Sequence, residues 1–214
     1  MKLIHTKSNE TLLKEIPSIP FHDLSIVFYL FLDKDEHGQM TVLIRNDHLP
    51  IWNTDTSELY KLAIDNTPRL YPPCIRSMAS LINDMLFVNG TLIQPSFAAA
   101  SPNALDLTDS PIPLSILTNT SGIFGASAML YPGVLKEFSK KIGHDLIILP
   151  SSVHEVLLLP YDSTYSFQEM ADMVKDVNEK CVPVEEQLSN QVYYYSSAQD
   201  SIFLGGDPAS RILS

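Results

Sequence analysis

The turn within the stretch HDLIILPSSVHEVLLLP carries the side chains that hydrolases use as nucleophile, base and acid. These residues are Ser151, Ser152, His154 and Glu155. A catalytic triad needs convergent geometry, usually reached from separate elements, and these residues are nearly consecutive. The second histidine of a helical HExxH zinc motif is also missing. We therefore predict that the turn closes a hairpin, and we favour ligand contact over catalysis as its functional role.

A second polar turn, TNTSGIFGASAM, follows an apolar stretch. Asn119 and Ser121 stand where they could line a pocket, although turn residues of this kind more often hydrogen-bond their own backbone. The glycines match no phosphate-binding motif, and Ser127 lacks the second glycine of a nucleophile elbow. A hydrolase would need its groups from distant elements, for example Ser127 or Ser151 with His154 or His48.

Neither a metal site nor a cofactor is predicted. The segment DKDEHGQMTVLI matches a calcium loop at Asp33, Asp35 and Gly38. Ile44 occupies the position that must supply a bidentate carboxylate, and predicted strands flank the segment. A polar hairpin turn is the favoured interpretation.

The two cysteines, Cys74 and Cys181, are too few for a disulfide framework and have no CxxC or paired histidines nearby. They indicate thiols in a reducing compartment. Cys181 falls on the apolar stripe of a predicted helix, so we expect a small core residue rather than a nucleophile.

The chain is acidic, with 14 Lys and Arg against 25 Asp and Glu and a formal net charge of -11 over 214 residues. Its field repels phosphate backbones and anionic lipid, so we expect no nucleic-acid partner and no membrane partner. The N-terminus lacks the apolar region of a signal peptide, and the apolar run 26–32 is too short to span a membrane. A cytoplasmic location is the expectation.

Three hairpins are predicted, at 23–46, 145–159 and 191–204, from alternating or continuous apolar runs around polar turns. Residues 146–149 and 156–159 are apolar on both faces, which is typical of central strands. The run Tyr193-Tyr194-Tyr195 is expected to pack in a sheet. Further strands are predicted at 114–120 and 122–130.

Four helices are predicted from apolar periodicity and end signals. Capping boxes begin two of them, at Asp55 with Glu58 and at Ser166 with Glu169. Pro68 is expected to end the first, and the second carries Cys181 on its stripe. The other two helices cover 75–86 and 132–143.

These elements predict an α+β fold, with helices packed on one mostly antiparallel sheet built from the hairpins. The hairpin–helix order of 23–68 recurs at 145–183, which allows a degenerate duplication. We expect residues 1–22 to form a polar N-terminal extension outside the core, 23–204 a single domain, and 205–214 a tail. The Pro-, Ala- and Ser-rich segment 89–113 is interpreted as an insertion or a flap.

Three segments, ELYKLAIDNTP (58–68), residues 116–160 and QVYYYS in the tail, resemble an uncharacterised family of unknown function from Clostridia-type bacteria. The resemblance covers roughly residues 20–204. It implies a bacterial, cytoplasmic protein, and it implies no activity, cofactor or catalytic residue.

The function predicted from the sequence is a binding or protein-interaction module, whose partner is a protein or a small molecule. A broad apolar core without convergent reactive groups is typical of such a protein. The hydrolase described above is the alternative, so the sequence leaves open whether the chain is an enzyme. It leaves a homodimer open as well.

Overall fold

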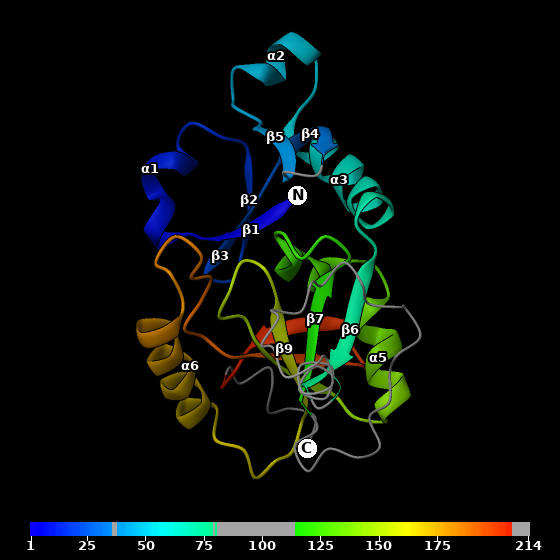
Figure 1. Cartoon of the computed structure of the whole chain (residues 1–214), viewed down its shortest axis with the longest axis vertical. Coiled ribbons are helices and arrows are strands. Elements are labelled where there is room, and N and C mark those ends of the chain that lie inside the picture. The colour runs from blue at the N-terminus through cyan, green and yellow to red at the C-terminus, as the bar shows by residue number, and fades with distance from the viewer. Residues whose placement is uncertain (36–37, 79, 81–113, 207–214) are drawn as a thin grey trace, which may run out of the picture.

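The computed structural model describes residues 1–35, 38–78, 80 and 114–206 (Figure 1). One sheet has six strands, in the spatial order β11 (Ser201–Leu204), β10 (Tyr193–Ser196), β8 (Leu146–Leu149), β9 (Val156–Pro160), β7 (Ser115–Asn119) and β6 (Pro73–Ser77). A second has β1 (Lys2–His5), β3 (Leu24–Val27) and β2 (Ser18–Phe21), and β4 (Tyr29–Asp35) pairs with β5 (Gly38–Leu43). All these pairings are antiparallel, which confirms the α+β class. The single sheet that we expected is divided into three.

Strands β8 and β9 lie in the middle of the six-stranded sheet and are covered on both faces, as their apolar runs predict. On one face Leu146 and Ile148 join the main core, and on the other Ile147 belongs to a second cluster. Helix α5 (Val134–Ile142) covers the first face and α6 (Phe167–Cys181) the second (Figure 1). The hairpins 145–159 and 191–204 are both confirmed.

The N-terminal residues 1–22 contribute to the core, which corrects the expectation of a polar extension outside it. Leu3 of β1 is 1% exposed and lies in the main core with Leu24 of β3. Strand β3 pairs with β1 on one side and with β2 on the other. Pro20 is tolerated because β2 is an edge strand. Two short helices connect β1 to β2, η1 (Lys7–Asn9) and α1 (Glu10–Leu13).

The predicted hairpin 23–46 is divided between two sheets. Strand β3 ends at Val27, and after Phe28 the chain continues as β4, which pairs with β5 alone. Asp33 and Asp35 of the rejected calcium loop lie in β4 and Gly38 lies in β5, so these residues belong to a hairpin, as expected. An apolar run without alternation carries no local signal for the point at which a chain changes sheets. The other predicted module, 145–183, has its hairpin inside the six-stranded sheet, so the two modules have different surroundings.

Of two further predicted elements, one is wrong in type and one begins later than expected. The predicted helix 75–86 begins too early, because Ile75 lies in strand β6, whereas Met78 and Ser80 are helical as predicted. The rest of that prediction, at Ala79 and from Leu81 onward, lies outside the described residues, as does the segment 89–113. Residues 122–130 form a turn and the 3-10 helix η3 (Gly125–Leu130), not a strand. A tight approach of this turn to β7, for which Gly125 leaves space, determines that conformation.

Both helix starts that were predicted from capping boxes are confirmed, each by its N-cap hydrogen bond. Asp55 accepts a hydrogen bond from the Glu58 N–H (2.9 Å) at the start of α3 (Thr56–Leu70), and the Ser166 Oγ accepts one from the Glu169 N–H (3.3 Å). The expectation that Pro68 ends the first helix is wrong, because α3 continues to Leu70. The Tyr71 N–H donates to the Thr67 carbonyl (2.8 Å) and closes the last turn. The short α2 (His48–Trp52) precedes α3.

Cys181 is exposed, so its expected place in the core is wrong. The buried position in this part of α6 is taken by Asn178, which is 1% exposed. Its amide donates to the Ser189 carbonyl (3.0 Å) and to the Asn190 Oδ1 (2.7 Å). Hydrogen bonds of this kind make the burial of a polar side chain favourable, and hydrophobic periodicity does not detect them.

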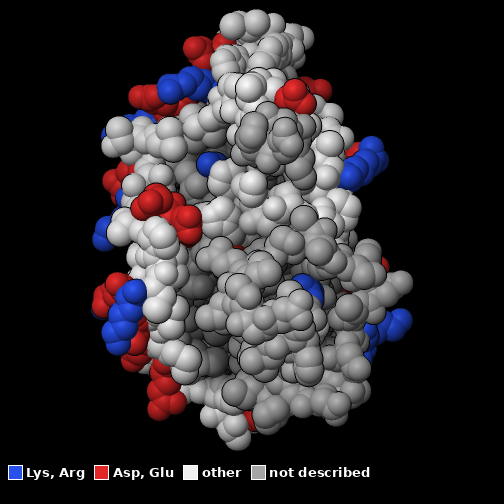
Figure 2. Space-filling view, in the orientation of Figure 1, with Lys and Arg blue, Asp and Glu red and all other residues white. Residues whose placement is uncertain are grey.

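The outer surface of α6 carries charges of both signs (Figure 2). Lys175 pairs with Glu179 (3.9 Å) and Lys180 with Asp176 (2.6 Å), each one helical turn apart. Exposed pairs at this spacing add little to stability, because water screens both charges. This surface is therefore a solvated helix face.

Each tyrosine of the run in β10 donates its hydroxyl to an aspartate from a different connection. Tyr193 donates to Asp23 (2.5 Å), Tyr194 to Asp145 and Tyr195 to Asp200 (2.6 Å). All three rings are buried, as predicted. The aspartates at 23 and 145 immediately precede β3 and β8, so these contacts fix the entry to both strands.

These tyrosines predict a loss of stability in alkaline solution. Burial first, and then the neighbouring aspartates, raise the pKa of each phenol above its ordinary value. Because the folded pKa is the higher one, this stabilisation is complete below about pH 10 and is lost as the pH rises above it. We expect the free energy of unfolding, measured by urea titration, to fall between about pH 9 and pH 11. The fall should be smaller in Tyr193→Phe, and an equal fall would contradict the assignment.

Candidate functional site

The six candidate residues from the sequence lie in two neighbouring connections. Asn119 and Ser121 follow β7, and residues 151–155 connect β8 to β9. The Thr118 Oγ1 donates to the His154 carbonyl (2.8 Å) and joins the two connections. The fold therefore brings these residues to one end of the six-stranded sheet.

Hydrogen bonds within the first connection satisfy its polar side chains. Asn119, 1% exposed, donates to the Ile123 carbonyl (3.0 Å) and accepts from the Ser121 N–H (2.9 Å) and hydroxyl (2.8 Å). These are the local bonds that the turn interpretation predicts. Ligand contact at Asn119 and Ser121 stays a prediction.

The connection from β8 to β9 is held against residues 186–189. The Val153 N–H donates to the Glu186 carbonyl (2.9 Å), and the Ser151 carbonyl accepts from the Leu188 N–H (3.0 Å). The Ser152 hydroxyl is buried and accepts from the His154 N–H (3.0 Å). These contacts are structural, and a role for either serine in binding also stays a prediction.

His154 and Glu155 precede β9 rather than lying on it. The His154 ring stacks on Phe124, with centroids 6.0 Å apart and an interplanar angle of 9°, and its Nε2 lies 3.7 Å from the Glu186 Oε1. Its Nδ1 accepts from the Phe124 N–H (3.4 Å). Burial is the main cause that raises the pKa of the Glu155 carboxyl, and the Glu186 carboxylate raises it further, whereas His154 and Ser152 lower it.

Among the described residues, no Ser, Thr or Cys side chain hydrogen-bonds the His154 ring. The Ser127 hydroxyl instead donates to the Phe124 carbonyl (2.9 Å). A serine and a histidine do meet at Ser8 Oγ and His5 Nδ1 (2.7 Å), but Asp23 Oδ2 is 4.0 Å from His5 Nε2, too far for a hydrogen bond. The described residues therefore do not assemble a Ser/His/acid site.

Phe124 connects this cluster to a second region. Its backbone has φ +54°, a conformation that is uncommon outside glycine. Tyr29 lies against its ring, with centroids 5.8 Å apart, and Lys2 Nζ is 4.3 Å from the ring centroid. Burial lowers the pKa of Lys2. These contacts link the turn residues to the wall of a cavity.

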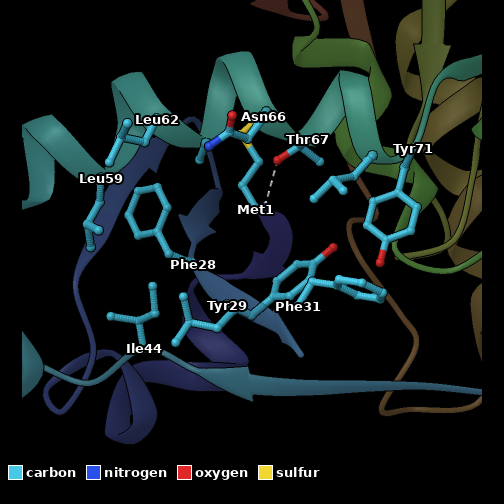
Figure 3. Close-up of a pocket in the computed structure, with 13 residues that line it drawn as sticks. Met1, Phe28, Tyr29, Phe31, Ile44, Leu59, Leu62, Asn66, Thr67 and Tyr71 are labelled. Carbon is cyan, nitrogen blue, oxygen red and sulfur yellow. Dashed lines mark hydrogen bonds between the residues drawn. The ribbon is translucent and has the colours of Figure 1, made fainter. Parts of the chain in front are cut away.

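A cavity of about 390 Å³ lies between β4 and α3 (Figure 3). Hydrophobic and aromatic side chains dominate its lining: Met1, Phe28, Leu30, Phe31, Ile44, Leu59, Leu62, Ala63 and Leu70, together with the rings of Tyr29 and Tyr71. Leu62 and Leu70 are each 54% exposed, so apolar side chains reach the surface at its edge. Its size and lining are those of a small-molecule pocket.

The polar groups of this cavity are few, and its one ionisable amine among the described residues, the Met1 α-amino group, has its pKa lowered to about 5 by burial, so it is neutral at pH 7. Asn66 and Thr67 come from α3, and Thr67 Oγ1 accepts a hydrogen bond from Met1 N (3.0 Å). The Tyr71 hydroxyl donates to the Gln39 Oε1 (2.8 Å). No Asp, Glu, Lys, Arg or His side chain of the described residues lines the cavity.

The Tyr29 hydroxyl has no hydrogen-bond partner within the described part of the chain and points into the space between Met1 and Tyr71 (Figure 3). Burial, with the phenols of Tyr71 and Tyr131 nearby, raises its pKa well above the ordinary value. The hydroxyl is therefore a neutral donor at physiological pH.

The described residues form an antiparallel α+β fold with an apolar cavity and a hydrogen-bonded polar turn cluster. These features are those of a globular protein with a candidate ligand pocket. More particularly, the chain belongs to the family of unknown function DUF5688, whose model matches residues 1–197. Comparisons with curated proteins and with solved structures found no match. This confirms the resemblance to an uncharacterised family.

Over the described ranges, no group of three or more His, Cys, Asp or Glu side chains is arranged to hold a metal ion. None of the helices in those ranges is long and apolar enough to cross a membrane.

Sequence reasoning missed the cavity, because its lining comes from β4, α3 and the first residue of the chain. Tyr29 and Tyr71 each stand in apolar surroundings in the sequence, which is a weak signal. Polar aromatic residues within core segments were the available clue, since a buried phenol usually finds a partner.

Proposed function

We propose that the protein binds a small, mainly apolar molecule in the cavity between β4 and α3. The observation that supports this proposal is a volume of about 390 Å³ lined by aliphatic and aromatic side chains with a few uncharged polar groups. Ligand pockets have this composition because apolar contact provides affinity and a few hydrogen bonds provide orientation. Exposed apolar side chains at its edge give a ligand access.

The proposed function is ligand binding, as predicted from the sequence, but the proposed site is the cavity rather than the turns at 119–121 and 151–155. The turn cluster around His154 has its polar groups engaged in internal hydrogen bonds, whereas the cavity has free volume and a phenol, that of Tyr29, without a hydrogen-bond partner among the described residues. The ring of Phe124 touches both Tyr29 and His154, so the cluster supports the cavity wall.

Filling the cavity should abolish binding. We expect Ala63→Trp to weaken the binding of cumene and acetophenone at least about tenfold, because the indole takes the volume in which a ligand makes its contacts. Calorimetric titration measures the affinity, and thermal unfolding reports whether each variant is folded. Ala63→Leu, a smaller change, should weaken binding less and keep the proposal testable if the tryptophan variant does not fold.

Ala198→Trp is the matched control, since Ala198 is exposed in the turn between β10 and β11 and does not line the cavity. It should bind both probes as the unaltered protein does. Undiminished binding by folded Ala63→Trp, or no binding of either probe to the unaltered protein, would overturn the proposal.

A further inference from the structure

We infer that the ligand of the cavity is uncharged and carries a hydrogen-bond acceptor, such as a carbonyl oxygen, that the Tyr29 hydroxyl binds. This inference rests on the proposed function and specifies its ligand class. It follows from which polar groups of the cavity are engaged and which are free.

The donors of the cavity differ in availability. The Tyr71 proton is engaged with Gln39 at 2.8 Å, and Thr67 Oγ1 accepts from Met1 N at 3.0 Å. Asn66 is exposed, so water competes for its amide. Tyr29 makes no hydrogen bond to any other described residue, although its ring lies within the cavity wall. Tyr29 is half-buried, so its hydroxyl makes fewer hydrogen bonds to water than it makes in the unfolded chain. A ligand acceptor would restore one of them.

Charge separates the ligand classes further. A carboxylate or an ammonium group would leave water for a space without an opposite charge on any lining side chain that the structure describes, and the Met1 α-amino group is neutral at pH 7 because burial lowers its pKa to about 5. The loss of hydration is then not compensated by a partner charge. A neutral acceptor avoids this cost and still accepts from the phenol.

The position of Tyr29 argues for a specific role rather than simple packing. Its ring is held by Phe124 at 5.8 Å, and Phe31 of the same strand is held by Tyr71 at 6.1 Å. A side chain fixed in this way presents its donor in one direction, which lowers the entropy lost on binding. Figure 3 shows that this direction is into the cavity.

The experiment uses three probes of equal size and different polarity on the full chain. Acetophenone has a carbonyl, cumene replaces it with an isopropyl group, and benzoate replaces it with a carboxylate. We expect acetophenone to bind about 3- to 10-fold more tightly than cumene, which corresponds to one net hydrogen bond, and benzoate to bind most weakly.

In Tyr29→Phe the preference for acetophenone over cumene should disappear, while the affinity for cumene stays the same. Tyr165→Phe, on the loop before α6, should keep the preference, since that residue does not line the cavity. A preference that persists in Tyr29→Phe, equal affinities in the unaltered protein, or tightest binding of benzoate would overturn the inference. If acetophenone and cumene bind the unaltered protein equally and both bind Ala63→Trp more weakly, the inference fails but the proposed function stands. If no probe binds the unaltered protein, the inference and the proposed function both fail.

Discussion

The substitution Gly125→Ala is expected to destabilise the protein by about 3 kcal/mol or more, through overpacking of a site that has no room. A Cβ at this position would lie 2.1 Å from the Thr118 Oγ1, 2.4 Å from the His154 carbonyl oxygen and 2.8 Å from the Asn119 backbone nitrogen. Two of these atoms belong to the backbone and cannot move without breaking the contact of η3 with β7. The effect should appear as a fall in the thermal midpoint of about 6 to 12 °C.

Gly143→Ala is the matched control. Nothing lies within 4 Å of a Cβ there, but its φ of +76° makes any other residue strained. The loss should therefore be about 1 kcal/mol, from backbone strain alone. A Gly125→Ala midpoint no lower than that of Gly143→Ala would show that the turn after β7 is not packed as described.

Asp23→Ala is expected to cost about 3 kcal/mol, because it leaves two hydroxyl groups without their acceptor. Tyr193, which is 0% exposed, donates to one carboxylate oxygen (2.5 Å), and Ser189 donates to the other (2.6 Å). These bonds connect the three-stranded sheet to β10 and to the segment before it. Urea unfolding of Asp23→Ala, Tyr193→Phe and the double variant measures the energy of this contact.

The double variant should be less destabilised than the sum of the single ones by about 1 kcal/mol or more, since each single substitution already removes the shared bond. Asp162→Ala is the control, because Asp162 is exposed and accepts from Thr164 rather than from a tyrosine. Strict additivity at Asp23 and Tyr193 would mean that the contact contributes nothing to stability.

The two candidate sites differ in how much of them a sequence can reveal. The turn cluster consists of two short polar segments, 119–121 and 151–155, and each is visible directly in the sequence, although only the fold brings the two together. Its hydrogen bonds also agree with turn chemistry. The cavity joins Tyr29 to Tyr71 and Thr67, which are far apart in the chain, and no spacing rule connects them.

By itself the sequence determined the elements whose stability is local or nearly so. The apolar runs of β8 and β9 specified central strands, because a segment apolar on both faces must be covered on both. Asp55 and Ser166 specified helix starts, because their side chains satisfy N–H groups of their own first turns. The acidic composition specified the sign of the protein's field.

Only the tertiary structure decided which sheet each strand joins, which side of α6 is buried, and where free volume remains. Strand β3 pairs with β1, and Asn178 is buried in place of Cys181, because contacts with distant segments outweigh local preference. A cavity is the volume that separately stable elements fail to fill. Its position depends on how β4 and α3 fit together, which no local pattern of residues encodes.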